Sequence, residues 1–222
     1  TATPAAQFGF LPLITGTLWV SLFAILFALP FGLSVAIYMS EVANSRVRNL
    51  LKPIIELLSG IPSVVYGFFG LIVIVPFLFL VFDLPVGESG LAGSIVLAIM
   101  ALPTIITVTE DAMRNCPRAM REASLALGAS QWQTIYKVVI PYSISGITSG
   151  VVLGIGRAVG ETMAVLMVTG NAAVIPHTIL EPLRTIPATI AAELGEAPAG
   201  GPHYEALFLL GVVLFFISLL IN

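Results

Sequence analysis

The feature that most constrains this chain is an apolar stretch, residues 11–38, that contains no charged side chain. A helix needs about 20 residues to cross the roughly 30 Å of hydrocarbon in a bilayer, so this stretch is long enough to span a membrane. Four other stretches meet or approach that length: 53–82, 91–108, 142–168 and 206–221. Only 9% of the residues are charged, whereas a soluble domain has about 25%. The sequence therefore predicts an all-α protein that crosses the membrane several times.

Composition also excludes several other classes of protein. A chain that is 58% hydrophobic is not intrinsically disordered, and a net charge of -3 argues against binding nucleic acid through a broad basic surface. The single cysteine, Cys116, forms no disulfide within the chain and supports no cysteine-based metal cluster. His177 and His203 lack carboxylate or thiolate companions at ligand spacing, so we expect no metal site.

The distribution of Lys and Arg predicts the orientation, because cytoplasmic loops of membrane proteins are enriched in both. Segment 170–205 holds only Arg184 and is therefore expected outside the cytoplasm, as are residues 1–10. An additional span before residue 1 would give six spans with both ends in the cytoplasm. We expect one transmembrane domain, 1–222. The residues expected on the cytoplasmic side are Arg46, Arg48, Lys52, Arg114, Arg118, Arg121 and Lys137.

The cytoplasmic stretch 110–141 contains a cluster of small residues around Gly128. Glycine readily adopts positive φ, and small neighbours let two short helices meet at a sharp corner. Such a corner can insert into a groove on another protein. An ordinary amphipathic helix pair at the membrane surface is the alternative.

The spacing within this stretch resembles a known motif. Glu122-Ala123-Ser124, three residues, Gly128, nine residues and then Val138-x-Ile140-Pro141 are similar to the pattern E-A-A-x3-G-x9-I-x-L-P of ABC importer membrane subunits. The resemblance implies a type I (MetI-like) permease fold with a coupling helix that docks on an ATPase subunit. The residues it implies for docking, with their neighbours, are Arg118, Arg121, Glu122, Ala123, Ser124, Gly128 and Trp132. The sequence has no G-x-x-x-x-G-K-[ST] motif, so ATP and Mg²⁺ are expected on the partner.

Three further segments resemble the phosphate-specific importer permeases: FLPLITGTL at 10–18, GIPSVVYGFFG at 60–70 and GRAVGETMAVL at 156–166. The last of these, followed by Gly170-Asn171, is closer to the PstC-like than to the PstA-like branch. The resemblance implies a multi-pass subunit of a prokaryotic inner or plasma membrane that imports phosphate by alternating access and is not an enzyme. The implied partners are a PstA-like permease, a PstB-like ATPase dimer and a PstS-like binding protein. The resemblance also implies that residues 1–222 form one permease domain, in which segment 170–205 receives the binding protein.

Other functions remain as alternatives on the residues alone. The cargo could be another oxyanion such as sulfate or molybdate, and an ion channel or secondary carrier would share the hydropathy pattern. An intramembrane enzyme is disfavoured, since neither H-E-x-x-H nor G-x-S-x-G occurs.

Two charged residues lie at membrane depth, where each costs about 2.5–3.5 kcal/mol on insertion scales. Arg157 and Glu161 are spaced to share one face of a continuous helix. Glycines at 146, 150 and 154 form a groove for a second helix on an adjoining face. We expect Arg157 to attract an oxyanion and Glu161 to be its partner. The alternative is an ion pair that only fixes helix packing.

Weaker candidates complete the substrate pathway. The Gly60-Ile61-Pro62-Ser63 run is expected to break or kink its span and to place Ser63 inside the membrane. Thr162 is a further candidate, although packing explains it as well. Lys52 and Glu56, one helical turn apart, are expected to form a surface salt bridge.

Overall fold

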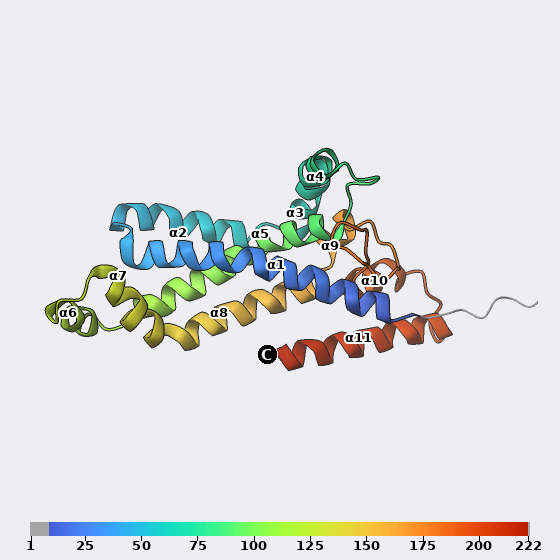
Figure 1. Ribbon diagram of the computed structural model, residues 1–222. Coiled ribbons are helices and arrows are strands. Elements are labelled where there is room, and N and C mark those ends of the chain that lie inside the picture. Colours follow the sequence, from blue (N-terminus) through green and yellow to red (C-terminus); the bar gives the residue numbers. More distant parts are fainter. Residues whose placement is uncertain (1–8, 222) are drawn as a thin grey trace, which may run out of the picture.

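The computed structural model describes residues 9–221, which form an elongated bundle of helices without a β-strand (Figure 1). The residues expected outside the cytoplasm at the start of the chain lie mostly outside this described range. The central helix is α5 (Gly90–Arg114), which packs against α1 (Leu11–Ile37) on one side and α8 (Ile140–Gly160) on the other. α11 (Pro202–Ile221) runs beside them.

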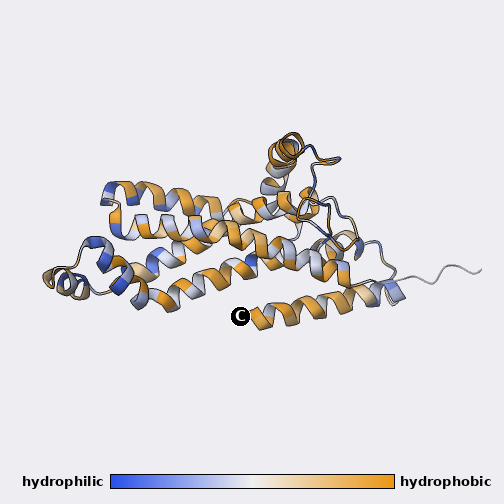
Figure 2. Ribbon diagram, viewed as in Figure 1, coloured by the Kyte–Doolittle hydropathy of each residue, from blue (hydrophilic) through white to orange (hydrophobic). Residues whose placement is uncertain are grey.

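The two ends of the bundle carry different segments. One end holds the short helices α6 (Arg118–Ala126) and α7 (Gln131–Thr134), and the opposite end holds α10 (Ile186–Glu193) with the irregular chain before it (Figure 1). Hydrophilic residues gather at these ends, while hydrophobic residues cover the helices between them (Figure 2). This arrangement agrees with the expectation that segments 110–141 and 170–205 lie on opposite sides of a membrane.

Within residues 9–221, five helical stretches are long and apolar enough to cross a membrane, as the sequence predicted. They are Leu11–Val42, Ser63–Phe82, Gly90–Arg114, Gln131–Gly160 and Pro202–Ile221. The first includes a π-helical turn, η1 (Tyr38–Val42), and the fourth includes another, η3 (Ile135–Val139).

The second span is shorter than the predicted 53–82, because the chain divides at Gly60–Pro62. Before the break lies the amphipathic helix α2 (Ser45–Ser59), so its basic residues stand on a helix and not in a loop. Tyr66 donates a hydrogen bond from Oη to the Leu58 carbonyl at 2.8 Å and fastens the two sides of the break. After it come α3 (Ser63–Phe69), the π-helical η2 (Gly70–Ile74) and α4 (Val75–Phe82). The break itself confirms the expectation from glycine and proline.

The fourth span also has other bounds than the predicted 142–168, since it begins at Gln131 and ends at Gly160. α8 ends at Gly160, Glu161 is extended with ψ 133°, and a separate helix, α9 (Met163–Val168), follows. α9 packs closely on α3: a Cβ added to Gly67 would lie 2.9 Å from Ala164 Cα. The fourth long helix therefore stops where α9 turns toward α3.

The glycine groove on α8 is confirmed, and α5 of the same chain fills it. A Cβ added to Gly146 would lie 2.3 Å from Ala112 Cβ, and one added to Gly154 would lie 2.8 Å from Ile105 Cγ1. Only a hydrogen at these positions allows the two helices to approach so closely.

Lys52 joins α2 to α5, and the predicted pair with Glu56 is wrong. Lys52 Nζ lies 2.8 Å from Glu110 Oε2 and 2.6 Å from Asp111 Oδ1, whereas Glu56 is exposed. Glu110 is fully buried and also contacts Arg114 at 3.4 Å. Burial acts to lower the pKa of Lys52, but its hydrogen bonds to Asp111 and Glu110 outweigh this and raise the pKa. Lys52 therefore stays charged well above neutral pH.

Candidate translocation and coupling sites

Arg157 lies one turn before the end of α8 and is partly buried. Its Nη1 donates a long hydrogen bond, 3.4 Å, to Oγ1 of Thr104 on α5. No acidic side chain in the described range forms an ion pair with it. Its other guanidinium nitrogens make no hydrogen bond to the described residues and are not fully buried. Such a fork of donors suits an oxyanion.

Glu161 does not pair with Arg157, and the prediction of that pair is wrong. The spacing rule for neighbouring side chains requires a continuous helix, and here the helix ends at Gly160. Glu161 Oε1 instead accepts a hydrogen bond from the backbone N–H of Ala164 at 3.3 Å, in the first turn of α9. Its carboxylate therefore stabilises the start of α9.

The other pathway candidates are separated. Thr162 lines an open pocket of about 470 Å³ between the α8–α9 break, α10 and α11. Arg157 and Ser63 do not line that pocket. Ser63 is the first residue of α3 and is partly exposed, without a side-chain hydrogen bond to the described part of the chain.

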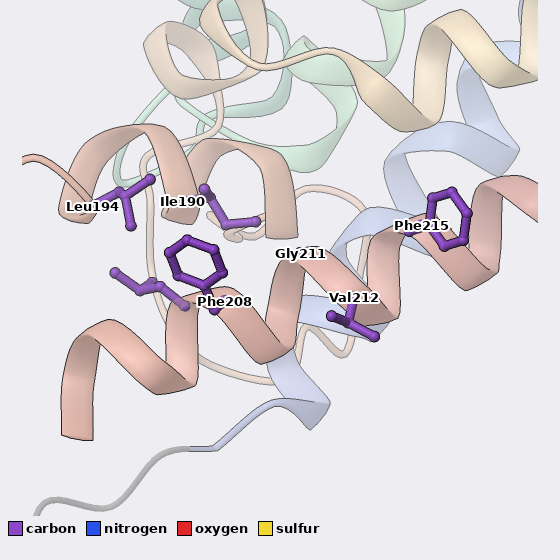
Figure 3. Close-up of a pocket in the computed structure, with 7 residues that line it drawn as sticks. Ile190, Leu194, Phe208, Gly211, Val212 and Phe215 are labelled. Atoms are coloured by element: carbon purple, nitrogen blue, oxygen red, sulfur yellow. The ribbon is translucent and has the colours of Figure 1, made fainter. Parts of the chain in front are cut away.

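A second pocket lies between α10 and α11 and has a volume of about 340 Å³ (Figure 3). Ile190 of α10 and Leu194 just after it lie beside Phe208 of α11, and Phe215 lies farther along α11 (Figure 3). Every lining residue is apolar or glycine. Without hydrogen-bond donors on its side chains, this pocket is unsuited to an oxyanion.

The corner around Gly128 has the predicted form of two short helices. Gly128 has φ +85°, and a Cβ placed on it would meet no atom within 4 Å. Ser130 caps α7 through a reciprocal pair of hydrogen bonds with Gln133. Ser124 Oγ lies 2.9 Å from Thr134 Oγ1 and links α6 to α7. Backbone conformation, not crowding, is what calls for glycine here.

The docking candidates divide into outward and inward groups. Glu122, Ala123 and Gly128 are exposed, and Trp132 is 65% exposed. Arg121 turns inward: its Nη2 lies 2.7 Å from Glu41 Oε1, and its Nη1 donates to the Cys116 carbonyl at 2.7 Å. Its guanidinium thus attaches α6 to the bundle, a role that sequence reasoning did not assign.

Sequence reasoning also missed Glu41 as an anchor. Its carboxylate accepts from Arg121 of α6, and its backbone carbonyl accepts from Nε2 of Gln131 of α7 at 3.1 Å. These partners are 80 and 90 residues away in the chain, so no local pattern connects them. Thr104 was missed for the same reason, because it lies 53 residues from Arg157.

Comparison with known proteins identifies the family. Residues 28–222 match the model of the "binding-protein-dependent transport system inner membrane component". A probable ABC transporter permease, YqgH of Bacillus subtilis, is 44% identical over 96% of this chain and 69% of its own length. The phosphate transport system permease PstC of Mesorhizobium japonicum is 40% identical over 97% of this chain and 71% of its own length. These relatives confirm the resemblance to PstC-like permeases.

Solved structures confirm the fold. The MetNI methionine ABC transporter in an inward-facing conformation gives a TM-score of 0.70 at 20% identity, covering 95% of this chain and 91% of the other. A bacterial ABC transporter that imports alginate gives a TM-score of 0.69 at 19% identity, covering 97% and 77%. The family match and the permease relatives set aside the channel, secondary-carrier and enzyme alternatives. The chain belongs to the family of binding-protein-dependent transport system inner membrane components, as a multi-pass permease subunit of an ABC importer.

Proposed function

We propose that this chain is the permease subunit of an ATP-driven importer of inorganic phosphate. The observation that carries the proposal is the 40% identity, over 97% of the chain, to a protein named as a phosphate transport permease. The open guanidinium of Arg157 supports it independently. An oxyanion cannot enter hydrocarbon unless fixed donors replace its water, and Arg157 lies within an apolar helix.

In this function Arg157 provides the charge that attracts phosphate, and Thr104 holds the guanidinium on the α5 side. Thr162 and Ser63 provide hydroxyl groups at the two helix breaks. Glu161 has a positioning role, since its carboxylate stabilises the start of α9. Alternating access exposes these groups first to one side of the membrane and then to the other.

The α6–α7 corner is the docking surface for the ATPase dimer, which binds ATP and Mg²⁺. Movement of the corner reaches the bundle through Glu41, because both short helices are hydrogen-bonded to that residue. Residues 1–222 act as one permease domain, with 110–141 as the coupling segment and 170–205 as the surface for a PstS-like binding protein. A PstA-like permease and PstB-like ATPases complete the complex.

Reconstitution tests the cargo. The complex is placed in vesicles with its binding protein, and ATP-dependent transport of radiolabelled phosphate, sulfate and molybdate is compared. We expect phosphate transport that an excess of unlabelled sulfate or molybdate does not reduce. Preferred transport of either competing anion would contradict the proposal.

Substitution at Gly128 tests the coupling role. Gly128→Trp is expected to leave the subunit inserted but to separate ATP hydrolysis from transport, because a bulky side chain fills the corner that docks. Gly128→Asn is the matched control, since asparagine tolerates positive φ better than other residues. We expect it to retain most transport. Full transport by Gly128→Trp would contradict docking through this corner.

A further inference from the structure

A basic pocket of about 280 Å³ lies at the α6–α7 end of the bundle, away from Arg157 and the substrate pathway. It forms where η1, the start of α2, the end of α5 and the start of α6 meet. We call it the arginine pocket, and its lining residues are Ser40, Glu41, Arg48, Arg114, Arg118 and Arg121.

The arginine pocket has more positive charge than its own carboxylate can neutralise. Glu41 is occupied by Arg121 at 2.7 Å and by Ser40 Oγ at 2.8 Å. Arg48 donates only to backbone carbonyls, those of Met39 and Ala43. Two guanidinium groups, those of Arg48 and Arg118, therefore have no acidic partner within the described range.

The guanidinium groups of Arg114 and Arg121 also have incomplete hydrogen bonding. Arg114 shares the buried carboxylate of Glu110 with Lys52, at 3.4 Å and 2.8 Å respectively. The Nε of Arg121 is buried without an acceptor. Arg118 is the first residue of α6, whose N-terminus has no side-chain cap. Unpaired backbone N–H groups and the helix dipole there add to the attraction for an anion.

We propose that the arginine pocket binds a phosphate-type oxyanion from the cytoplasmic side and that this binding slows transport. Several guanidinium forks converging with a hydroxyl group match the planar, multiple hydrogen bonding that phosphate oxygens accept. Free inorganic phosphate and the headgroup of an anionic lipid share this chemistry. An acidic side chain of the ATPase is a different occupant, which the test below separates.

The effect on transport follows from the position of Arg121. The same guanidinium that lines the pocket fastens α6 to Glu41, and Glu41 also holds α7. An anion bound beside Arg121 competes with Glu41 for the donors of Arg121 and loosens the link between the docking corner and η1. Cytoplasmic phosphate would then reduce its own import, and this regulatory reading rests on the proposed function.

A binding measurement tests the site without relying on transport. The complete complex, without its binding protein and without nucleotide, is placed in nanodiscs of phosphatidylcholine, and radiolabelled phosphate is added in equilibrium dialysis. We expect Arg118→Gln to weaken binding severalfold and Arg48→Gln with Arg118→Gln to weaken it about tenfold or more. Arg46→Gln is the control, because Arg46 is an exposed arginine of α2 that does not line the pocket. Equal binding by all variants would overturn the proposal.

Arg118→Gln keeps the test valid if the double variant folds poorly, since Arg118 is exposed and its side chain makes no hydrogen bond or ion pair with the described residues. If binding appears in phosphatidylcholine, free phosphate is the ligand. A lipid headgroup is the ligand if two results occur together. Phosphate then binds only weakly in phosphatidylcholine, and vesicles containing phosphatidylglycerol slow ATP hydrolysis by the control but not by the double variant. Both results support an oxyanion site. Loss of the ATPase from the purified double variant, with phosphate binding unchanged, would assign the pocket to an acidic side chain and overturn the proposal.

Transport gives the regulatory readout. The complex is placed in vesicles so that the ATPase faces the bath, which then corresponds to the cytoplasm. Labelled phosphate and the binding protein are enclosed in the lumen. ATP added to the bath drives movement of the labelled phosphate from the lumen into the bath. Millimolar phosphate in the bath should slow the Arg46→Gln control at least threefold and the double variant little. Equal slowing of the control and the double variant would contradict regulation through the arginine pocket. Transport of another anion would contradict the proposed function while leaving the dialysis result intact.

Discussion

At the scale of single residues, Arg157 lies within a membrane-length helix and has no acidic partner among the described residues. Among the described residues only Thr104 accepts a hydrogen bond from its guanidinium, so we expect the charge to be available to the cargo. We expect Arg157→Gln to reduce phosphate transport at least tenfold, which corresponds to about 1.4 kcal/mol or more. Assembly with the partner subunits should remain. The measurement is ATP-dependent uptake, normalised to the amount of purified complex.

The double variant Arg157→Met with Glu161→Leu distinguishes a packing role from a pathway role. If the two residues served only as an ion pair, replacing both with apolar side chains would restore transport. Glu161 contacts the N–H of Ala164 instead, so we expect no recovery. Restored uptake would show that Arg157 is structural.

Lys52 is a second residue whose role follows from its contacts. Lys52→Met leaves the buried carboxylate of Glu110 with only the longer contact to Arg114. We expect this change to destabilise the protein by about 1–3 kcal/mol, seen as a lower thermal midpoint in detergent. Glu56→Gln is the control and should leave the midpoint unchanged, because Glu56 is exposed. Equal effects of the two changes would instead favour the pair that the sequence spacing predicted.

At the scale of helices, the close packing of α8 on α5 depends on glycine at particular positions. Gly146→Ala places a methyl group 2.3 Å from Ala112 Cβ, and we expect overpacking to cost about 1–3 kcal/mol. Gly156→Ala, on the same helix, meets no atom within 4 Å and should be neutral or slightly stabilising. Thermal unfolding of the two variants in one detergent compares them. Similar midpoints would contradict a groove filled by α5.

At the scale of the whole molecule, the outer side of α8 is available to a second permease. Leu153 on that helix is 51% exposed, and the native thiol of Cys116 is buried. We expect Leu153→Cys to cross-link in membranes to a related but different chain, since the implied complex has two distinct permeases. Ala101→Cys is the control and should not react, because Ala101 is only 1% exposed in the core. Recovery of self-linked dimers alone would contradict the heterodimer.

The sequence by itself determined the number of membrane-crossing helices, the opposite placement of segments 110–141 and 170–205, and the corner at Gly128. These features are local: an apolar run, a charge count and a fixed spacing each depend on residues close together in the chain. The break at Gly60–Pro62 was predictable for the same reason.

Only the tertiary structure decided which charges meet. Lys52 selects Glu110, 58 residues away, over the adjacent Glu56, and Arg121 selects Glu41, 80 residues away. Spacing placed Glu161 beside Arg157, but α8 ends between them as the chain turns so that α9 packs on α3. A side chain within a bundle pairs with the groups that helix packing brings close to it. That packing depends on the whole chain.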